Sequence, residues 1–193
     1  MALLTGSNKI KTAVFISGTG SNLRSLIKFS KLKKSPISIN LIISNNQKSK
    51  GLNFGKIFKI KKKIFNYQKK KLTEKKILFE LKKNNIDLIC LAGFMKILSK
   101  TFIREFNGKI LNIHPSLLPK FKGLNTHERV IRNKEKYSGC TIHHVSSKLD
   151  SGKIILQARV RINKFDTPKT LAKKILIQEH KLYPAAIMKI LSL

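Results

Sequence analysis

The sequence predicts an α/β fold, a mostly parallel, doubly wound sheet with flanking helices. Three observations lead to this prediction. Apolar runs of strand length alternate with helical patterns through the first half of the chain. The first strand ends in a glycine-containing turn, G-T-G-S-N (18–22), which leads directly into a helix. A later run, Ile86–Leu91, is almost wholly apolar, as is typical of a strand at the centre of a parallel sheet.

Each element of the first half follows from the spacing of its apolar residues. The expected strands are Thr12–Ser17, Ile37–Ile43, Lys63–Phe65, Ile86–Leu91 and Ile110–Ile113. The expected helices are Ser21–Phe29, Gly51–Phe58, Glu74–Lys83 and a helix that Ser99 caps and that continues through Phe106. In the third of these, Ile77, Leu78 and Leu81 recur at helical spacing, and Ser is a favoured N-cap residue. The order β-α-β-α makes this half Rossmann-like.

The second half has a different pattern. Thr126 is expected to cap a helix that ends near Arg132. Two longer strands follow, Gly139–Val145 and Lys153–Ile162, joined by a turn at Leu149–Gly152. A final helix opens at Thr167 with Pro168 at its first position, which suits proline. Because the chain contains no repeat and no low-complexity linker, we expect a single domain over 1–193, with an N-terminal half of about 10–100 and a C-terminal half of about 101–193.

Composition favours a soluble, cytoplasmic protein. No run approaches the roughly 20 apolar residues of a membrane span. Residues 1–9 lack a basic start followed by a long apolar stretch, so we expect no secretory signal. Cys90 and Cys140 lie in apolar, strand-like segments without a C-x-x-C partner. We therefore expect two buried thiols rather than a disulfide or a metal site.

The net charge is extreme, with 41 Lys and Arg against 9 Asp and Glu, a formal charge of +32. One interpretation is nucleic-acid binding. The other is compositional drift, since Lys, Asn and Ile share AT-rich codons and only six of the 41 basic residues are Arg. The basic residues are spread along the whole chain with few aromatic residues among them. We prefer drift and expect no specific nucleic-acid partner, although such a field would attract an anionic substrate.

Two segments of the first half have the features of ligand sites. In the 18–22 turn, glycines let the backbone approach a phosphate, and the following helix supplies free N–H donors. A dinucleotide fingerprint would need glycine where Leu23 stands, so the turn suits a single phosphate. The segment L-A-G-F-M-K-I-L (91–98) follows a central strand, where open α/β sheets bind ligands. Phe94, Met95, Ile97 and Leu98 could form an apolar wall there for a flat heterocycle, although core packing would produce the same pattern.

Polar residues of the second half could meet at a reaction centre. In L-N-I-H-P-S-L-L-P (111–119), Asn112 and His114 are two apart and share one face of a strand end. An amide and an imidazole on one face can both donate to an oxygen on which negative charge develops. Asp150, one of three aspartates, lies in the turn S-K-L-D-S-G (147–152), and Glu179 lies in Q-E-H-K-L-Y-P (178–184) on the last helix.

Other reaction classes lack their motifs. The G-x-S-x-G elbow of serine hydrolases is absent, which argues against a role for Ser116 beside His114. His143 and His144 are adjacent on a strand and point to opposite faces, so they cannot bind one metal together. Neither H-E-x-x-H nor a Cys/His cluster is present, and we expect no metal.

Together these segments resemble the phosphoribosylglycinamide formyltransferase family, from about Thr12 to Ala186. The resemblance rests on the ordered set G-T-G-S-N, L-A-G-F-M-K-I-L, L-N-I-H-P-S-L-L-P, the Asp150 turn, I-I-L-Q and E-H-K-L-Y-P. It implies the formyltransferase fold, with phosphate binding in the first half and folate binding and catalysis in the second. It also implies transfer of a formyl group from 10-formyltetrahydrofolate to 5-phosphoribosylglycinamide in purine biosynthesis, by a monomer or homodimer that needs no metal.

The resemblance also implies roles for individual residues. The catalytic residues would be Asn112, His114 and Asp150, with His143 nearby. The substrate-binding residues would be Gly20, Ser21, Asn22, Leu176, Ile177, Gln178 and Glu179. The folate-binding residues would be Lys70, Met95, Lys96, Ile97, Leu98, Asn112, Ser146, Ser147, Lys148, Leu149 and Asp150. Lys96 and Lys70 stand where the family commonly has Arg, which keeps the charge but loses bidentate hydrogen bonding.

In the expected reaction, the substrate amine attacks the formyl carbon, and protonated His114 and the Asn112 amide stabilise the developing negative charge. Asp150 would favour the charged imidazole and hold a water that relays the proton. Two related enzymes are alternatives. A methionyl-tRNA formyltransferase would carry an additional tRNA-binding domain, for which 193 residues leave no room. A formyltetrahydrofolate hydrolase would usually carry an N-terminal regulatory domain and would release formate without an acceptor.

Overall fold

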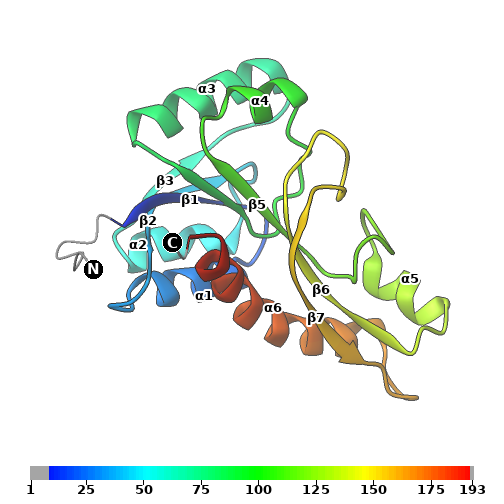
Figure 1. The fold of residues 1–193 in the computed structure, drawn as a ribbon. Coiled ribbons are helices and arrows are strands. Elements are labelled where there is room, and N and C mark those ends of the chain that lie inside the picture. The colour runs from blue at the N-terminus through cyan, green and yellow to red at the C-terminus, as the bar shows by residue number, and fades with distance from the viewer. Residues whose placement is uncertain (1–8, 192–193) are drawn as a thin grey trace.

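The computed structural model describes residues 9–191 and contains one seven-stranded sheet (Figure 1). The strand order is β3-β2-β1-β4-β5-β6-β7. The strands are β1 (Ile10–Ile16), β2 (Ile37–Ser44), β3 (Lys61–Ile64), β4 (Leu88–Leu91), β5 (Lys109–His114), β6 (Tyr137–His144) and β7 (Ile154–Arg161). The first five strands are parallel, and β6 and β7 join the edge in antiparallel pairing. The predicted mostly parallel α/β fold is confirmed.

Helices cover both faces of this sheet. They are α1 (Ser21–Ser30), the short helix η1 (Lys50–Leu52), α2 (Asn53–Ile57), α3 (Lys70–Lys83), α4 (Lys100–Glu105), α5 (Thr126–Arg132) and α6 (Pro168–Leu191). Side chains alternate along β1, so Val14 packs toward α1 and α6 while Phe15 packs toward α3 and α4. Each face of the sheet thus has its own apolar core, and the central strands are buried on both sides.

Local sequence signals set several element boundaries. Gly20 at the start of α1 has φ +76°, and a Cβ there would lie 2.7 Å from the Gly51 Cα, so this turn requires glycine. The Ser99 hydroxyl accepts a hydrogen bond from the Phe102 N–H at 3.0 Å, which confirms the predicted cap of α4. Helix α6 begins at Pro168, as predicted. Cys90 and Cys140 are free and buried, which confirms the expected thiols.

Several predicted boundaries differ from the structure by a few residues, and three of these differences have a clear physical cause. Strand β3 is Lys61–Ile64 rather than 63–65, because pairing with β2 defines it and its lysine-rich sequence carries no apolar alternation. Helix α3 begins at Lys70 rather than at Glu74, since its first turn is charged and exposed. Thr126 is the first residue of α5, and Asn125, in the left-handed region, occupies the N-cap position.

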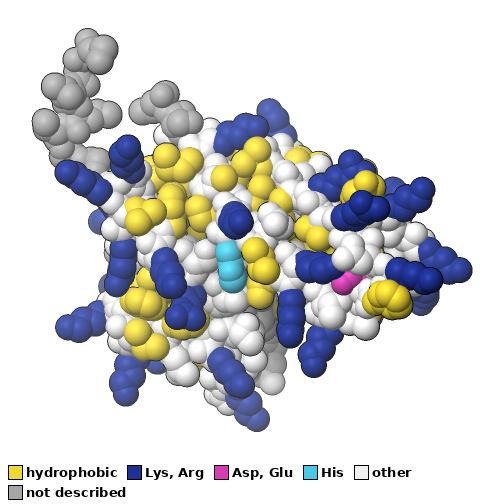
Figure 2. All heavy atoms as spheres, turned by 90° about the horizontal axis from the view of Figure 1, so that it is seen from below, with side chains coloured by type: hydrophobic (Ala, Val, Ile, Leu, Met, Phe, Trp, Pro, Cys, Tyr) yellow, Lys and Arg dark blue, Asp and Glu magenta, His cyan; other side chains and the backbone are white. Residues whose placement is uncertain are grey.

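The surface reflects the composition. On the face of α1 and α6, Lys and Arg side chains are scattered over the surface and along its edges instead of gathering in one stripe (Figure 2). No helix within residues 9–191 is long and apolar enough to cross a membrane. The prediction about a secretory signal concerns residues 1–9, of which residues 1–8 lie outside the described part of the chain.

Candidate active site

A cleft of about 660 Å³ opens at the carboxyl ends of β1, β4 and β5. In the strand order β3-β2-β1-β4-β5, the chain passes from β1 to β2 on one side and from β4 to β5 on the other. Open α/β sheets bind ligands at such a point, between two neighbouring strands whose connections run in opposite directions. Its lining combines apolar residues with Asn, His, Asp and Glu side chains from distant parts of the sequence. The predicted site residues that line it are Asn22, Met95, Lys96, Ile97, Leu98, Asn112, His114, His143, Ser146, Lys148, Leu149, Asp150 and Glu179.

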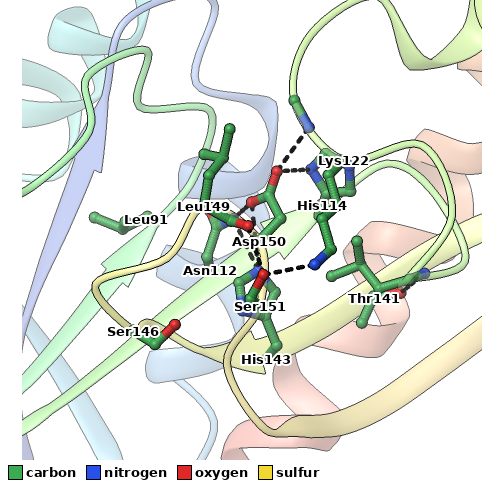
Figure 3. A network of polar contacts seen from close by, with 12 residues as sticks. Leu91, Asn112, His114, Lys122, Thr141, His143, Ser146, Leu149, Asp150 and Ser151 are labelled. Carbon is green, nitrogen blue, oxygen red and sulfur yellow. Dashed lines mark hydrogen bonds and ion pairs between the residues drawn. The ribbon is translucent and has the colours of Figure 1, made fainter.

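The centre of this cleft contains Asn112, His114 and Asp150 (Figure 3). Asn112 and His114 lie on β5, and Asp150 lies in the β6–β7 connection. The His114 Nδ1 is 3.3 Å from Asp150 Oδ2, and the Asn112 Nδ2 is 3.4 Å from Asp150 Oδ1. The three side chains predicted to converge are therefore in mutual contact around one carboxylate.

The orientation of Asp150 is set by several backbone features. Its φ of +46° is left-handed, a conformation that Asp adopts more readily than most residues. Next to it, a Cβ at Gly152 would lie 1.6 Å from the His144 carbonyl oxygen, so the turn requires glycine there. The Gly123 N–H donates to Asp150 Oδ2 at 2.9 Å. The carboxylate is thus buried and lies against groups from two places, the Gly123 N–H of the loop before α5 and the Asn112 and His114 side chains of β5.

Both ring nitrogens of His114 are engaged. Nε2 lies 2.9 Å from the Phe121 carbonyl oxygen, which can only accept, so Nε2 carries a proton. Nδ1 faces Asp150 Oδ2, so an N–H on Nδ1 would donate to that carboxylate. Donation from His114 to a substrate oxygen therefore requires one of these two partners to be exchanged.

His143 is a neutral acceptor for Asn112. Its Nδ1 lies 2.8 Å from the His144 carbonyl oxygen and so carries the proton. Burial lowers the pKa of His143, and this effect outweighs nearby Asp150. The unprotonated Nε2 then accepts from the Asn112 Nδ2 at 3.2 Å. His143 thereby orients the Asn112 amide.

The far end of the cleft contains a second buried polar contact. The Asn22 Nδ2 donates to Glu179 Oε2 at 2.7 Å, and both residues are 8% exposed. The Asn22 Oδ1 has no hydrogen-bond partner in the described structure. Burial raises the pKa of Glu179, partly offset by the hydrogen bond from Asn22. Gly20 and Ser21 precede Asn22 at the N-terminal end of α1, where backbone N–H groups are free.

Several predicted ligand-binding residues do not line the cleft. They are Gly20, Ser21, Lys70, Ser147, Leu176, Ile177 and Gln178. Lys70 is exposed at the start of α3, and Ser147 is exposed in the β6–β7 connection. Of the predicted segment on α6, Glu179 alone reaches the cleft. The roles of these residues stay predictions.

The sequence analysis missed the loop that leads into α5. Gly123–Asn125 of this loop and Thr126–Glu128 of the first turn of α5 line the cleft, and Leu124 is 72% exposed at the rim. Positive φ values at Phe121, Gly123 and Asn125 turn this loop back over β5. The run F-K-G-L-N contains Gly and Asn, the residues most tolerant of such angles, and this was the available signal.

Comparison with known proteins agrees with this architecture. Residues 10–187 match the family model described as formyl transferase. This places the chain in the formyl transferase class.

Individual relatives identify the family within this class. Phosphoribosylglycinamide formyltransferase from Bacillus subtilis is 35% identical over 186 residues, which cover 95% of each chain. The crystal structure of phosphoribosylglycinamide formyltransferase from Brucella melitensis has a TM-score of 0.90 and 40% identity, covering 95% of this chain and 96% of that one. The trifunctional purine biosynthetic protein adenosine-3 of Homo sapiens is 42% identical over 190 residues, but the match spans only 18% of its length. The chain belongs to the phosphoribosylglycinamide formyltransferase family.

Proposed function

We propose that this chain transfers the formyl group of 10-formyltetrahydrofolate to the amino group of 5-phosphoribosylglycinamide. The products are formylglycinamide ribonucleotide and tetrahydrofolate, in de novo purine biosynthesis in the cytoplasm. The observation that carries the proposal is the contact of Asn112, His114 and Asp150 at the centre of a cleft. The substrates are small molecules, and no specific nucleic acid takes part.

The two ends of the cleft differ in a way that suits two substrates. One end of the cleft is lined by Asn22 in the first turn of α1, and the N–H groups of Gly20, Ser21 and Asn22 beside this end suit the phosphate of the ribonucleotide. The buried Glu179 carboxyl and the unpartnered Asn22 Oδ1 suit ribose hydroxyls beside it. Leu176, Ile177 and Gln178 belong to the same turn of α6 and would support this end.

The other end suits the folate. Met95 is 62% exposed and Ile97 58% exposed, and with Leu124 and Leu149 they give the cleft an apolar rim. Exposed apolar side chains of this kind fit the flat face of a pterin ring. The backbone around Ser146–Asp150 forms the opposing side, and Lys96 and Lys148 provide positive charge for the carboxylates of the folate tail.

The central side chains have the properties that formyl transfer requires. As the substrate amine adds to the formyl carbon, negative charge develops on the formyl oxygen. The Asn112 amide and the cationic His114 ring stabilise that charge. To do so, His114 exchanges either the Phe121 carbonyl or the Asp150 carboxylate for the formyl oxygen. Asp150 lies against the His114 Nδ1 and holds the water that carries the amine proton to the departing folate nitrogen. The C–N bond to the substrate forms in this addition. The C–N bond to the folate breaks when the tetrahedral intermediate collapses and the departing folate nitrogen takes up the amine proton.

An absorbance assay for folate product tests the proposal. We expect tetrahydrofolate to form only when purified glycinamide ribonucleotide is present. Release of formate from 10-formyltetrahydrofolate without acceptor would instead indicate a hydrolase. Absence of reaction under both conditions would contradict formyl transfer altogether.

A further inference from the structure

One wall of the cleft has little regular structure of its own. The segment 93–98 joins β4 to α4 without helical or strand hydrogen bonding. Two of its apolar side chains, Met95 and Ile97, are more than half exposed. An irregular segment with few buried apolar contacts opens readily unless other elements hold it. The position of this wall therefore depends on its anchors.

The first anchors lie at the β4 end of the wall. The Ser17 N–H donates to the Gly93 carbonyl at 3.1 Å, and the Ser17 hydroxyl accepts from the Met95 N–H at 2.8 Å. The Phe94 ring packs edge-on against Phe15 and Tyr67, at centroid distances of 5.2 and 5.6 Å. These contacts fix residues 93–95. Leu98, at the other end of the wall, is 4% exposed and packs in the apolar core with Ile77 and Phe102, so the exposed residues Lys96 and Ile97 lie between two anchored ends.

Besides the packing of Leu98, the end of the wall next to α4 is held by a polar contact with a buried carboxylate outside the cleft. Glu74 Oε1 accepts from the Ser99 N–H at 2.9 Å. Glu74 is 4% exposed and lies on the buried face of α3 with Ile77 and Leu81. Burying a carboxylate costs free energy unless it is well hydrogen-bonded, and an apolar residue would continue this face of α3. Packing of α3 alone therefore does not account for Glu74.

We propose that Glu74 is a positioning residue for folate binding: by holding the Ser99 N–H, it fixes the α4 end of the wall formed by residues 93–98. This inference rests on the proposed function, because the wall matters only if the folate lies against it. Glu74 does not line the cleft, so its influence passes through Ser99.

Substitutions of Glu74 test this inference. Glu74→Met removes the acceptor at similar size, and Glu74→Gln keeps a carbonyl oxygen that can still accept from Ser99. We expect Glu74→Met to weaken binding of tetrahydrofolate about tenfold, measured by calorimetry, and to change binding of glycinamide ribonucleotide less than twofold. We expect Glu74→Gln to restore tetrahydrofolate binding to within about twofold. Glu80→Met, on the same helix but outside the buried face, is the matched control and should bind both ligands normally.

Substitutions of Ser99 provide a second, independent test that spares α3. Ser99 has φ −72°, which proline accepts, so Ser99→Pro removes the N–H without changing the backbone angle. Ser99→Ala removes the hydroxyl cap of α4 and keeps the N–H. We expect Ser99→Pro to weaken tetrahydrofolate binding several-fold more than Ser99→Ala does.

The possible outcomes separate this inference from the proposed function. If the wild type binds both ligands and Glu74→Met binds tetrahydrofolate as tightly, Glu74 has no positioning role. The inference would also be overturned if Glu74→Met weakened the binding of both ligands equally. The same holds if Glu74→Gln bound tetrahydrofolate as weakly as Glu74→Met. If Glu74→Met does not fold, equal binding by Ser99→Pro and Ser99→Ala would overturn it. A wild type that binds neither ligand would overturn both proposals.

Discussion

Replacing Asp150 with Asn removes one charge from the centre of the site and turns one of its two acceptor oxygens into a donor NH2 group. Asn tolerates the left-handed backbone at this position, where φ is +46°. Its side-chain oxygen can still accept from the Gly123 N–H, now 2.9 Å from Asp150 Oδ2. The substitution therefore keeps the shape of the turn while it removes the ionic contact with His114 and the oxygen that accepts from the Asn112 Nδ2.

The expected size of the effect follows from that contact. Unit charges 3.3 Å apart attract by about 5 kcal/mol at an effective dielectric of ~20. Part of this attraction is offset by the cost of burying both groups, which are 6% and 7% exposed. Loss of one electrostatic contribution of this kind commonly removes about 3–4 kcal/mol of transition-state stabilisation. We therefore expect kcat to fall about 10²- to 10³-fold.

The assay compares turnover with binding. Turnover is measured by absorbance at saturating concentrations of both substrates, and ligand binding by calorimetry with glycinamide ribonucleotide and tetrahydrofolate. We expect Asp150→Asn to bind both ligands within a few-fold of the wild type. A variant that retains more than a tenth of wild-type kcat would refute the reasoning. Loss of both ligands would show that Asp150 shapes the cleft instead of supporting the reaction.

Three further predictions follow from single contacts. His143→Ala removes the acceptor that orients the Asn112 amide, and kcat in the absorbance assay should fall about tenfold, or ~1.4 kcal/mol; unchanged kcat would show that this contact is dispensable. Burial raises the pKa of Glu179 above its ordinary value of 4.5. Above pH 4.5, ionisation of the Glu179 carboxyl therefore lowers the free energy of unfolding of the wild type. Urea unfolding should therefore show Glu179→Gln gaining stability relative to the wild type as pH rises from 4.5 to 7.5, and the opposite trend would contradict the burial argument. Gly20→Ala places a Cβ 2.7 Å from the Gly51 Cα at φ +76°, and should lower the free energy of unfolding by at least about 1–2 kcal/mol in the same titration; a neutral result would mean that the turn relaxes freely.

The central strands were predictable because burial on both faces leaves a continuous apolar run. Ile86–Leu91 carried this signal, and β4 lies in the middle of the sheet. By contrast, β3 is an exposed edge strand of mostly lysine, defined by pairing with β2 alone. Its limits depend on tertiary contacts that no local pattern records.

The site was predictable where spacing along one element fixed geometry. Asn112 and His114 share a face of β5 because side chains two apart point the same way, and the Asp150 turn returns to them. The engagement of both His114 nitrogens was not predictable, since the Phe121 carbonyl reaches the ring through a loop with left-handed residues. The contact of Glu74 with Ser99 was also not predictable, because the sequence of a helix rich in charged residues does not show which of its acidic side chains is buried.

A double-mutant cycle tests most directly whether the central side chains act as one unit in formyl transfer. The measurement is kcat with both substrates for the wild type, His114→Ala, Asp150→Asn and the double variant. When two residues act as a unit, the loss of kcat in the double variant is much smaller than the product of the losses in the two single variants. We predict that the double variant is no slower than the slower single variant by more than a few-fold. A double variant whose loss equals the product of the two single losses would show that His114 and Asp150 act independently, contrary to this account.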